Sequence, residues 1–216
     1  MRDLYHEQLD SVGHTLVEMT ELVGQGLERA TRALLGSDLA LAEAVISADD
    51  AVDALYRELD VRTLDLMARQ QPVAGDLRTL VTSLRMSADL ERMGDLARHI
   101  AKVARMRYPE CAVPDELRET VGEMGRIGVE LAERVGRVVE GKDVEAAREL
   151  EAEDDAVDRL HRAVFRSLLS QESPYTIEMA IDLTLVSRYY ERFADHAVSV
   201  ANRVVFMVTG EHNTEG

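Results

Sequence analysis

The sequence predicts an all-α protein made of two tandem, sequence-related three-helix bundles. Apolar residues recur at helical spacing along nearly the whole chain, and helix breakers are confined to a few short segments. No segment shows the alternation of β-branched residues that predicts a strand. Acidic motifs of the first half return in the second half, which indicates an internal repeat and therefore two similar units.

Breakers and capping residues bound the three helices of the first half. Gly36 ends the first helix, and Ser37 and Asp38 can cap the second. Pro72 and Gly75 interrupt the chain before the third helix. The expected helices span residues 3–35, 38–69 and 75–107. A helix of about 30 residues is about 45 Å long, which suits an elongated bundle.

The second half follows the same plan. Pro114 precedes the fourth helix, Gly141 and Asp143 separate the fourth from the fifth, and Pro174 separates the fifth from the sixth. The expected helices span residues 115–140, 143–170 and 175–209. We therefore assign residues 1–110 to the first bundle, 111–210 to the second and 211–216 to a frayed tail without apolar residues.

The composition narrows the function. The net charge of −16, with basic residues scattered among acids, argues against binding nucleic acid or an anionic membrane surface. The single cysteine, Cys111, cannot form an intrachain disulfide or a thiolate metal cluster. The polar N-terminus does not resemble a signal peptide, and no apolar run is long enough to span a membrane. A cytoplasmic protein is expected.

Four acidic motifs are the most informative feature of the chain. In each motif an Asp or Glu is followed four residues later by Asp, so that two carboxylates lie one turn apart on one helix face. The four pairs are Asp49 and Asp53, Glu91 and Asp95, Asp154 and Asp158, and Glu191 and Asp195. Like charges at this spacing repel each other, and a bound cation is the simplest reason to repeat the arrangement.

The two pairs of each half are expected to face each other. Residues equidistant from the turn of an antiparallel hairpin lie at the same height, and the first two pairs are centred about Pro72 and the last two about Pro174. Glu91 and Asp95 also continue an apolar stripe that we expect to face the core, and Asp49 and Asp53 continue another. These stripes are Leu77, Val81, Leu84 and Ala88, and Ala42, Val45 and Ile46. Carboxylates on a core face must be paired, protonated or coordinated.

Two interpretations of these acids stay open. Four facing carboxylates form an all-oxygen site for one or more hard cations such as Mg²⁺, Mn²⁺ or Fe³⁺. Alternatively, nearby arginines neutralise the acids as ion pairs without metal. The candidate arginines are Arg57, Arg92, Arg98, Arg162, Arg188 and Arg192.

Other candidate ligands and motifs are weaker. His99 lies one turn beyond Asp95, but Ser199 stands at its repeat position. His196 is expected to point elsewhere, so an ordinary surface or packing role is favoured for both histidines. The Glu-x-x-His pattern of di-iron bundles is absent from both Glu-Arg motifs, which argues against redox catalysis. Gly122, Gly125 and Gly128 predict a close backbone approach. No catalytic glycine or nucleophile motif occurs, so an enzyme is not expected.

In combination, these residues resemble the PhoU family of phosphate-signalling regulators. The resemblance rests on Tyr5-His6-Glu7-Gln8-Leu9, on Gln71-Pro72-Val73-Ala74-Gly75-Asp76-Leu77-Arg78 and on the two Glu-Arg-x-x-Asp motifs, and it covers nearly the whole chain. It implies two three-helix bundles side by side. It also implies a cytoplasmic, non-enzymatic adaptor between PstB, the ATPase subunit of the phosphate ABC transporter, and the sensor histidine kinase PhoR.

The resemblance implies a negative regulator of the phosphate regulon and of phosphate uptake. A homodimer is expected, with membrane contact only through its partners. Some members bind clusters of iron, zinc or other metals on these motifs, so by position all eight acids are candidate ligands, with Asp50 and Asp155 less favoured. Manganese and magnesium are further candidates. The alternatives are a metal-dependent enzyme or metal-storage bundle, and a helical scaffold with no role in phosphate metabolism.

Overall fold

Helices make up nearly all of the chain, and no strand occurs among the described residues. This computed structural model describes residues 2–170 and 174–211, with side chains for all of them except residues 2–4 and 151–154. The predicted tail lies outside the described residues except for Glu211. The helices are α1 (Arg2–Gly36), α2 (Leu39–Gln70), α3 (Ala74–Arg107), α4 (Asp115–Gly141), α5 (Val144–Glu149), α6 (Glu151–Leu168) and α7 (Ile177–Thr209).

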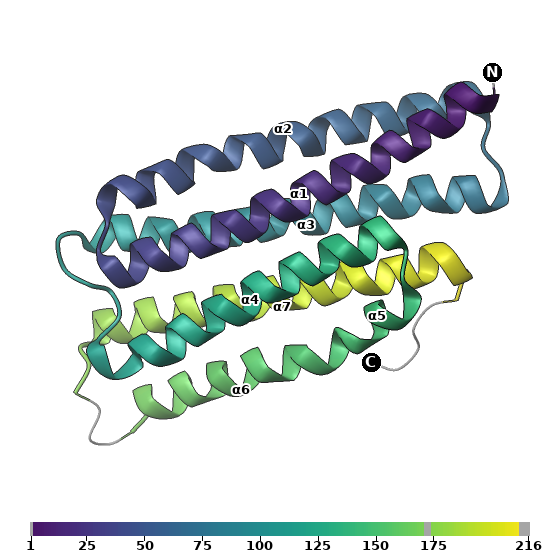
Figure 1. Cartoon of the computed structure of the whole chain (residues 1–216). Coiled ribbons are helices and arrows are strands. Elements are labelled where there is room, and N and C mark those ends of the chain that lie inside the picture. Colours follow the sequence, from purple (N-terminus) through teal and green to yellow (C-terminus); the bar gives the residue numbers. More distant parts are fainter. Residues whose placement is uncertain (1, 171–173, 212–216) are drawn as a thin grey trace.

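The helices form two bundles that lie side by side, as the internal repeat predicted (Figure 1). One bundle contains α1, α2 and α3, and the other contains α4, α5, α6 and α7. Where the bundles meet, α1 packs against α4 and α3 packs against α7, while α2 and α6 lie on the outside. None of the described helices combines the length and the apolar composition that a membrane-spanning helix needs.

At two of the predicted breaks an aspartate caps the following helix. The Asp38 carboxylate accepts a hydrogen bond from the Leu41 backbone N–H at 2.9 Å, and Asp143 caps α5 in the same way at 3.1 Å. The predicted fifth helix, in contrast, is divided at Leu150 into α5 and α6. Leu150 keeps right-handed helical angles and is fully buried, as is Ala147, and no Gly or Pro marks the division.

Helices α3 and α7 cross the bundle interface antiparallel and with pseudo-twofold symmetry. Asp89 of α3 contacts Ser199 of α7, and ten residues further along α3 His99 stacks on Tyr189, ten residues back along α7. Asp89 and Tyr189 are equivalent in the repeat, and so are His99 and Ser199. The same helix crossing therefore occurs twice with different side chains.

One hydrophobic core runs through both bundles. It includes Leu27 of α1 and Phe193 of α7, both fully buried, and the Tyr190 hydroxyl is 2.8 Å from Thr31 Oγ1 across the interface. The predicted close approach at the glycines of α4 is confirmed at Gly128, where a Cβ atom would lie 2.5 Å from Leu27 Cδ2. The four acidic motifs lie on the other long helices, α2, α3, α6 and α7.

Candidate functional site

The four acids of the first half, which we name the first acidic set, meet where α2 faces α3. They are Asp49, Asp53, Glu91 and Asp95. Arg98 Nη1 lies 3.1 Å from Asp49 Oδ2, and Arg98 Nη2 donates to Asp95 Oδ1. One guanidinium of α3 thus joins carboxylates of both helices, as the hairpin geometry predicted.

Asp49 is the most deeply buried acid of this set, with an exposed fraction of 7%. It fits because α3 has a glycine opposite: a Cβ atom on Gly94 would lie 2.8 Å from Asp49 Oδ1. Burial raises the pKa of Asp49 to about 6. The positive charge of Arg98 opposes this shift, and the negative charges of the nearby acids, of which Asp53 has the largest effect, add to it. Arg98 thus only partly offsets the cost of burying the charged Asp49 carboxylate.

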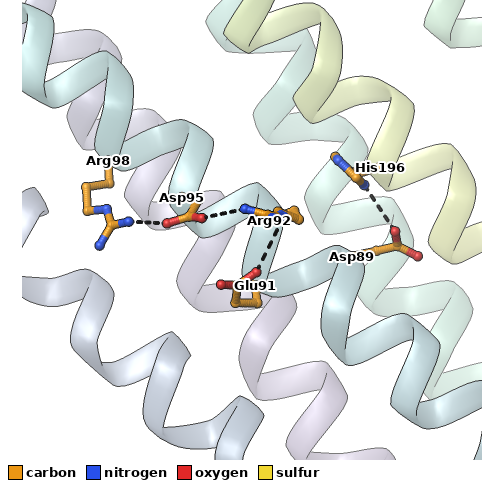
Figure 2. Close-up of polar contacts among 6 residues, drawn as sticks. All are labelled: Asp89, Glu91, Arg92, Asp95, Arg98 and His196. Atoms are coloured by element: carbon orange, nitrogen blue, oxygen red, sulfur yellow. Dashed lines mark hydrogen bonds and ion pairs between the residues drawn. The ribbon is translucent and has the colours of Figure 1, made fainter.

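A second arginine, Arg92, lies at the solvent side of the same set. Arg92 Nη1 is 3.1 Å from Asp95 Oδ2, and its Nε is 3.9 Å from Glu91 Oε2 (Figure 2). The Arg92 side chain is 64% exposed, against 27% for Arg98. Desolvation and then the neighbouring Asp95 raise the pKa of Glu91. Asp95 therefore lies between two guanidinium groups, one on the surface and one half-buried.

The predicted orientation of the α3 stripe is wrong. Leu77 is 41% exposed, Ala88 is exposed, and Val81 and Leu84 are only half-buried. Helix α3 packs against α1, α2 and α7, so its core positions are others, such as Leu80. Glu91 and Asp95 are accordingly only half-buried. The predicted α2 stripe holds, with two residues buried and one half-buried, and Asp49 is buried beyond it.

The second acidic set lies at the equivalent contact of α6 with α7. It consists of Asp154, Asp158, Glu191 and Asp195, and the side chain of Asp154 lies outside the described residues. Asp158 pairs with Arg162 of its own helix at 3.6 Å. Glu191 is 8% exposed and pairs with Arg188, one turn earlier on α7.

Asp195 lies at the surface of α7 and within electrostatic reach of α6. Desolvation by the surrounding protein raises the pKa of Asp195, Arg188 opposes the shift and Asp158 adds to it. This influence of an α6 carboxylate on an α7 carboxylate agrees with the predicted facing of the two pairs.

Among the described side chains, no group of three or more His, Cys, Asp or Glu residues is arranged to hold a metal ion. In the first set Arg92 and Arg98 pair with three of the four acids, which is the ion-pair arrangement considered from the sequence. Asp154 is not described, so the second set is not tested in this way. Metal binding by the eight acids stays a prediction.

A buried polar cluster around Asp89 was not predicted. Asp89 is 8% exposed and receives three contacts from α7: His196 Nδ1 at 3.1 Å, Ser199 Oγ at 3.2 Å and Arg203 Nε at 2.5 Å (Figure 2 shows His196). Burial raises the pKa of Asp89, but the hydrogen bonds from His196 and Arg203 outweigh it and the pKa is lowered. His196 thus points away from the acidic set, as predicted.

The sequence offered no signal for this cluster. The partners of Asp89 lie more than a hundred positions later in the chain, and its repeat equivalent is Tyr189, so the repeat gave no hint. The packing role predicted for His99 is confirmed by its stack on Tyr189, with ring centroids 5.3 Å apart.

Comparison with known proteins decides which family has this arrangement. The family model described as the PhoU domain matches residues 16–104 and 121–204. The chain belongs to the PhoU family. One matched segment lies in each bundle, so the internal repeat inferred from the acidic motifs is a repeat of the PhoU domain.

Similar PhoU proteins match nearly end to end. Phosphate-specific transport system accessory protein PhoU homolog 2 of Mycobacterium tuberculosis is 49% identical over 210 residues, which cover 97% of this chain and 99% of that protein. Homolog 1 of the same organism is 39% identical and covers 100% of this chain and 97% of its own length. The crystal structure of PhoU from Pseudomonas aeruginosa superposes with a TM-score of 0.87 at 27% identity, over 96% of this chain and 100% of that one.

Proposed function

We propose that this PhoU-family chain is a cytoplasmic, non-enzymatic accessory protein that represses the phosphate regulon and limits phosphate uptake. The observation that carries the proposal is the end-to-end match, at 49% identity, to a protein named as a phosphate-specific transport system accessory protein. The proposed partners are a PstB-type ATPase subunit and a PhoR-type sensor kinase, and the chain is proposed to act as a homodimer.

Regulation by protein contact agrees with the surface of α7. Ile177, Ile181 and Leu185 recur at intervals of four residues, so they form one stripe, and they are 81%, 55% and 41% exposed. An exposed apolar stripe of this kind is typical of a surface that binds another protein. One turn beyond it lies Arg188, which pairs with Glu191 of the second acidic set. A partner that covers the stripe would therefore also reach charged groups.

The acids themselves are better suited to electrostatic recognition than to catalysis. In the first acidic set, Asp49 and Asp95 are already paired with Arg98. A general base needs a carboxylate free to accept the proton it abstracts. The net charge of −16 favours association with basic partner surfaces.

A gene deletion with complementation tests the proposal. In phosphate-replete medium the deletion strain is expected to express a phosphate-regulon reporter at a higher level than the wild-type strain. Complementation with the wild-type gene should restore the repressed level. Unchanged reporter output in the deletion strain would contradict a regulatory role.

A paired substitution tests the contact mechanism. Ile181→Glu with Leu185→Glu places charge on the exposed stripe, and the variant is expected to fold but not to restore repression. Val61→Glu with Leu64→Glu is the matched control, because these α2 side chains are 68% and 52% exposed. Pull-down with the purified PstB-type subunit should separate the two variants, and equal capture of both would count against the α7 stripe.

A further inference from the structure

The Arg98 guanidinium lies between carboxylates of two helices, where a bound cation would make similar contacts. Its two terminal nitrogens contact Asp49 of α2 and Asp95 of α3, so a single positive charge joins the two facing helices. Only 27% of its side chain is exposed, and its Nε is buried without a hydrogen-bond partner. The guanidinium is thus held inside the acidic set rather than extended over the surface.

The second half of the chain has no arginine at the repeat position of Arg98. The repeat position of Arg98 is occupied by Val198, which is half-buried on α7. The arginines that contact described acids of the second set, Arg162 and Arg188, each pair with an acid of their own helix. The residue that bridges two helices in the first half is therefore replaced by an apolar valine at the equivalent position of the second.

We propose that Arg98 is the built-in cation of the first acidic set and takes the place that a metal ion would otherwise occupy between α2 and α3. A metal ion that bridged Asp49 and Asp95 in this place would have to displace the guanidinium. Displacement would leave a half-buried positive charge unpaired beside a second cation, and both effects are unfavourable. Asp49 and Asp95 thus keep the same positive partner whatever the metal supply.

This inference goes beyond the proposed function, because it holds whether or not the protein regulates phosphate uptake. It concerns equilibrium binding of a metal ion to the purified chain. The test therefore needs no partner protein and no assay of phosphate signalling, and failure of either proposal leaves the other standing.

The experiment isolates the first acidic set by neutralising the second. The background chain carries Asp154→Asn, Asp158→Asn, Glu191→Gln and Asp195→Asn. In this background Arg98→Met removes the guanidinium and keeps an apolar stem of similar length. Arg92→Met is the matched control, because Arg92 also pairs with Asp95 but is 64% exposed and does not contact Asp49. Mn²⁺ alone is the probe, and the fall of the free Mn²⁺ signal in electron paramagnetic resonance reports its binding.

We expect Arg98→Met to bind Mn²⁺ at least about tenfold more tightly than the background chain, and Arg92→Met to change the Kd by less than about threefold. The melting temperature of Arg98→Met should also rise with Mn²⁺, and that of the background chain should not. If circular dichroism finds Arg98→Met unfolded, Arg98→Gln carries the same test. Equal Mn²⁺ affinity with and without Arg98, or a gain from Arg92→Met as large as that from Arg98→Met, would overturn the proposal.

Discussion

Two aspartates of this chain are buried to nearly the same extent and yet have opposite electrostatic character. Asp49 is 7% exposed and Asp89 is 8% exposed. The pKa of Asp49 is raised to about 6, whereas the pKa of Asp89 is lowered. Burial is the largest single influence on both carboxyls, so burial does not explain the difference.

The difference lies in the partners. Asp89 receives His196, Ser199 and Arg203 from the facing helix. Asp49 shares one guanidinium with Asp95 and has further acids beside it. A buried carboxylate is stabilised by the donors that converge on it and destabilised by neighbouring negative charge. Asp89 is therefore suited to hold the two bundles together, and Asp49 to remain sensitive to protons.

The strongest test of this comparison removes the Asp89 carboxylate. Asp89→Ala leaves Arg203 and His196 without their partner at the bundle interface, where they are 30% and 19% exposed. The free energy of unfolding should fall by about 3 kcal/mol, as for other half-broken buried ion pairs. Urea unfolding measures this loss. Asp50→Ala, at an exposed position of α2, is the control and should change the free energy of unfolding by less than about 0.5 kcal/mol. A similarly small loss for Asp89→Ala would show that Asp89 does not stabilise the bundle interface.

The second test uses pH. The folded pKa of Asp49, about 6, lies above the ordinary value of 3.8, so the native state binds the proton more tightly. Its contribution is fully present below about pH 4 and is lost as the pH rises through 6. The full shift corresponds to about 3 kcal/mol, which solvent screening reduces to about 2 kcal/mol. For Asp89 the sign is opposite: its contribution is present above the ordinary pKa and is lost at lower pH.

Asp49→Asn should abolish the Asp49 part of this pH profile. The free energy of unfolding, measured with chelator between pH 4.5 and 7.5, should then fall less steeply with rising pH than in the wild-type chain. Parallel profiles for the two proteins would show that Asp49 does not titrate in this range.

The smallest expected effect concerns the space that admits Asp49. A Cβ atom on Gly94 would overlap the Asp49 carboxylate, so Gly94→Ala forces that carboxylate to move. Overpacking costs about 2 kcal/mol, and the better helix propensity of Ala returns about 1, so a net loss of about 1 kcal/mol is expected. Gly13→Ala, with nothing within 4 Å, should instead stabilise the chain by up to about 1 kcal/mol in the same urea assay. A gain at Gly94 equal to that at Gly13 would contradict the close approach of Asp49.

The fold could be predicted almost completely from the sequence, because its signals are local or repeated. Periodicity, caps such as Asp38 and the acidic repeat each act over a few residues or at a fixed offset. The division at Leu150 could not be predicted, since no Gly or Pro marks it.

For the candidate site, the sequence predicted which acids face each other but not which arginines pair with them. The distance from Pro72 placed Asp49 opposite Asp95, and Arg98 was among several arginines that could neutralise them. Only the structure shows that Arg98 spans both helices and Arg92 does not contact Asp49. The contacts of Asp89 join distant parts of the chain with no repeated counterpart, so no pattern within one helix could indicate them.

The pseudo-twofold crossing of α3 and α7 has a consequence for cooperativity. Each bundle covers apolar side chains of the other, as Phe193 of α7 lies in the same core as Leu27 of α1. Loss of structure in either bundle would expose the other's share of that core to water. The stabilities of the two repeats are therefore coupled, and a destabilising substitution in one PhoU repeat weakens both.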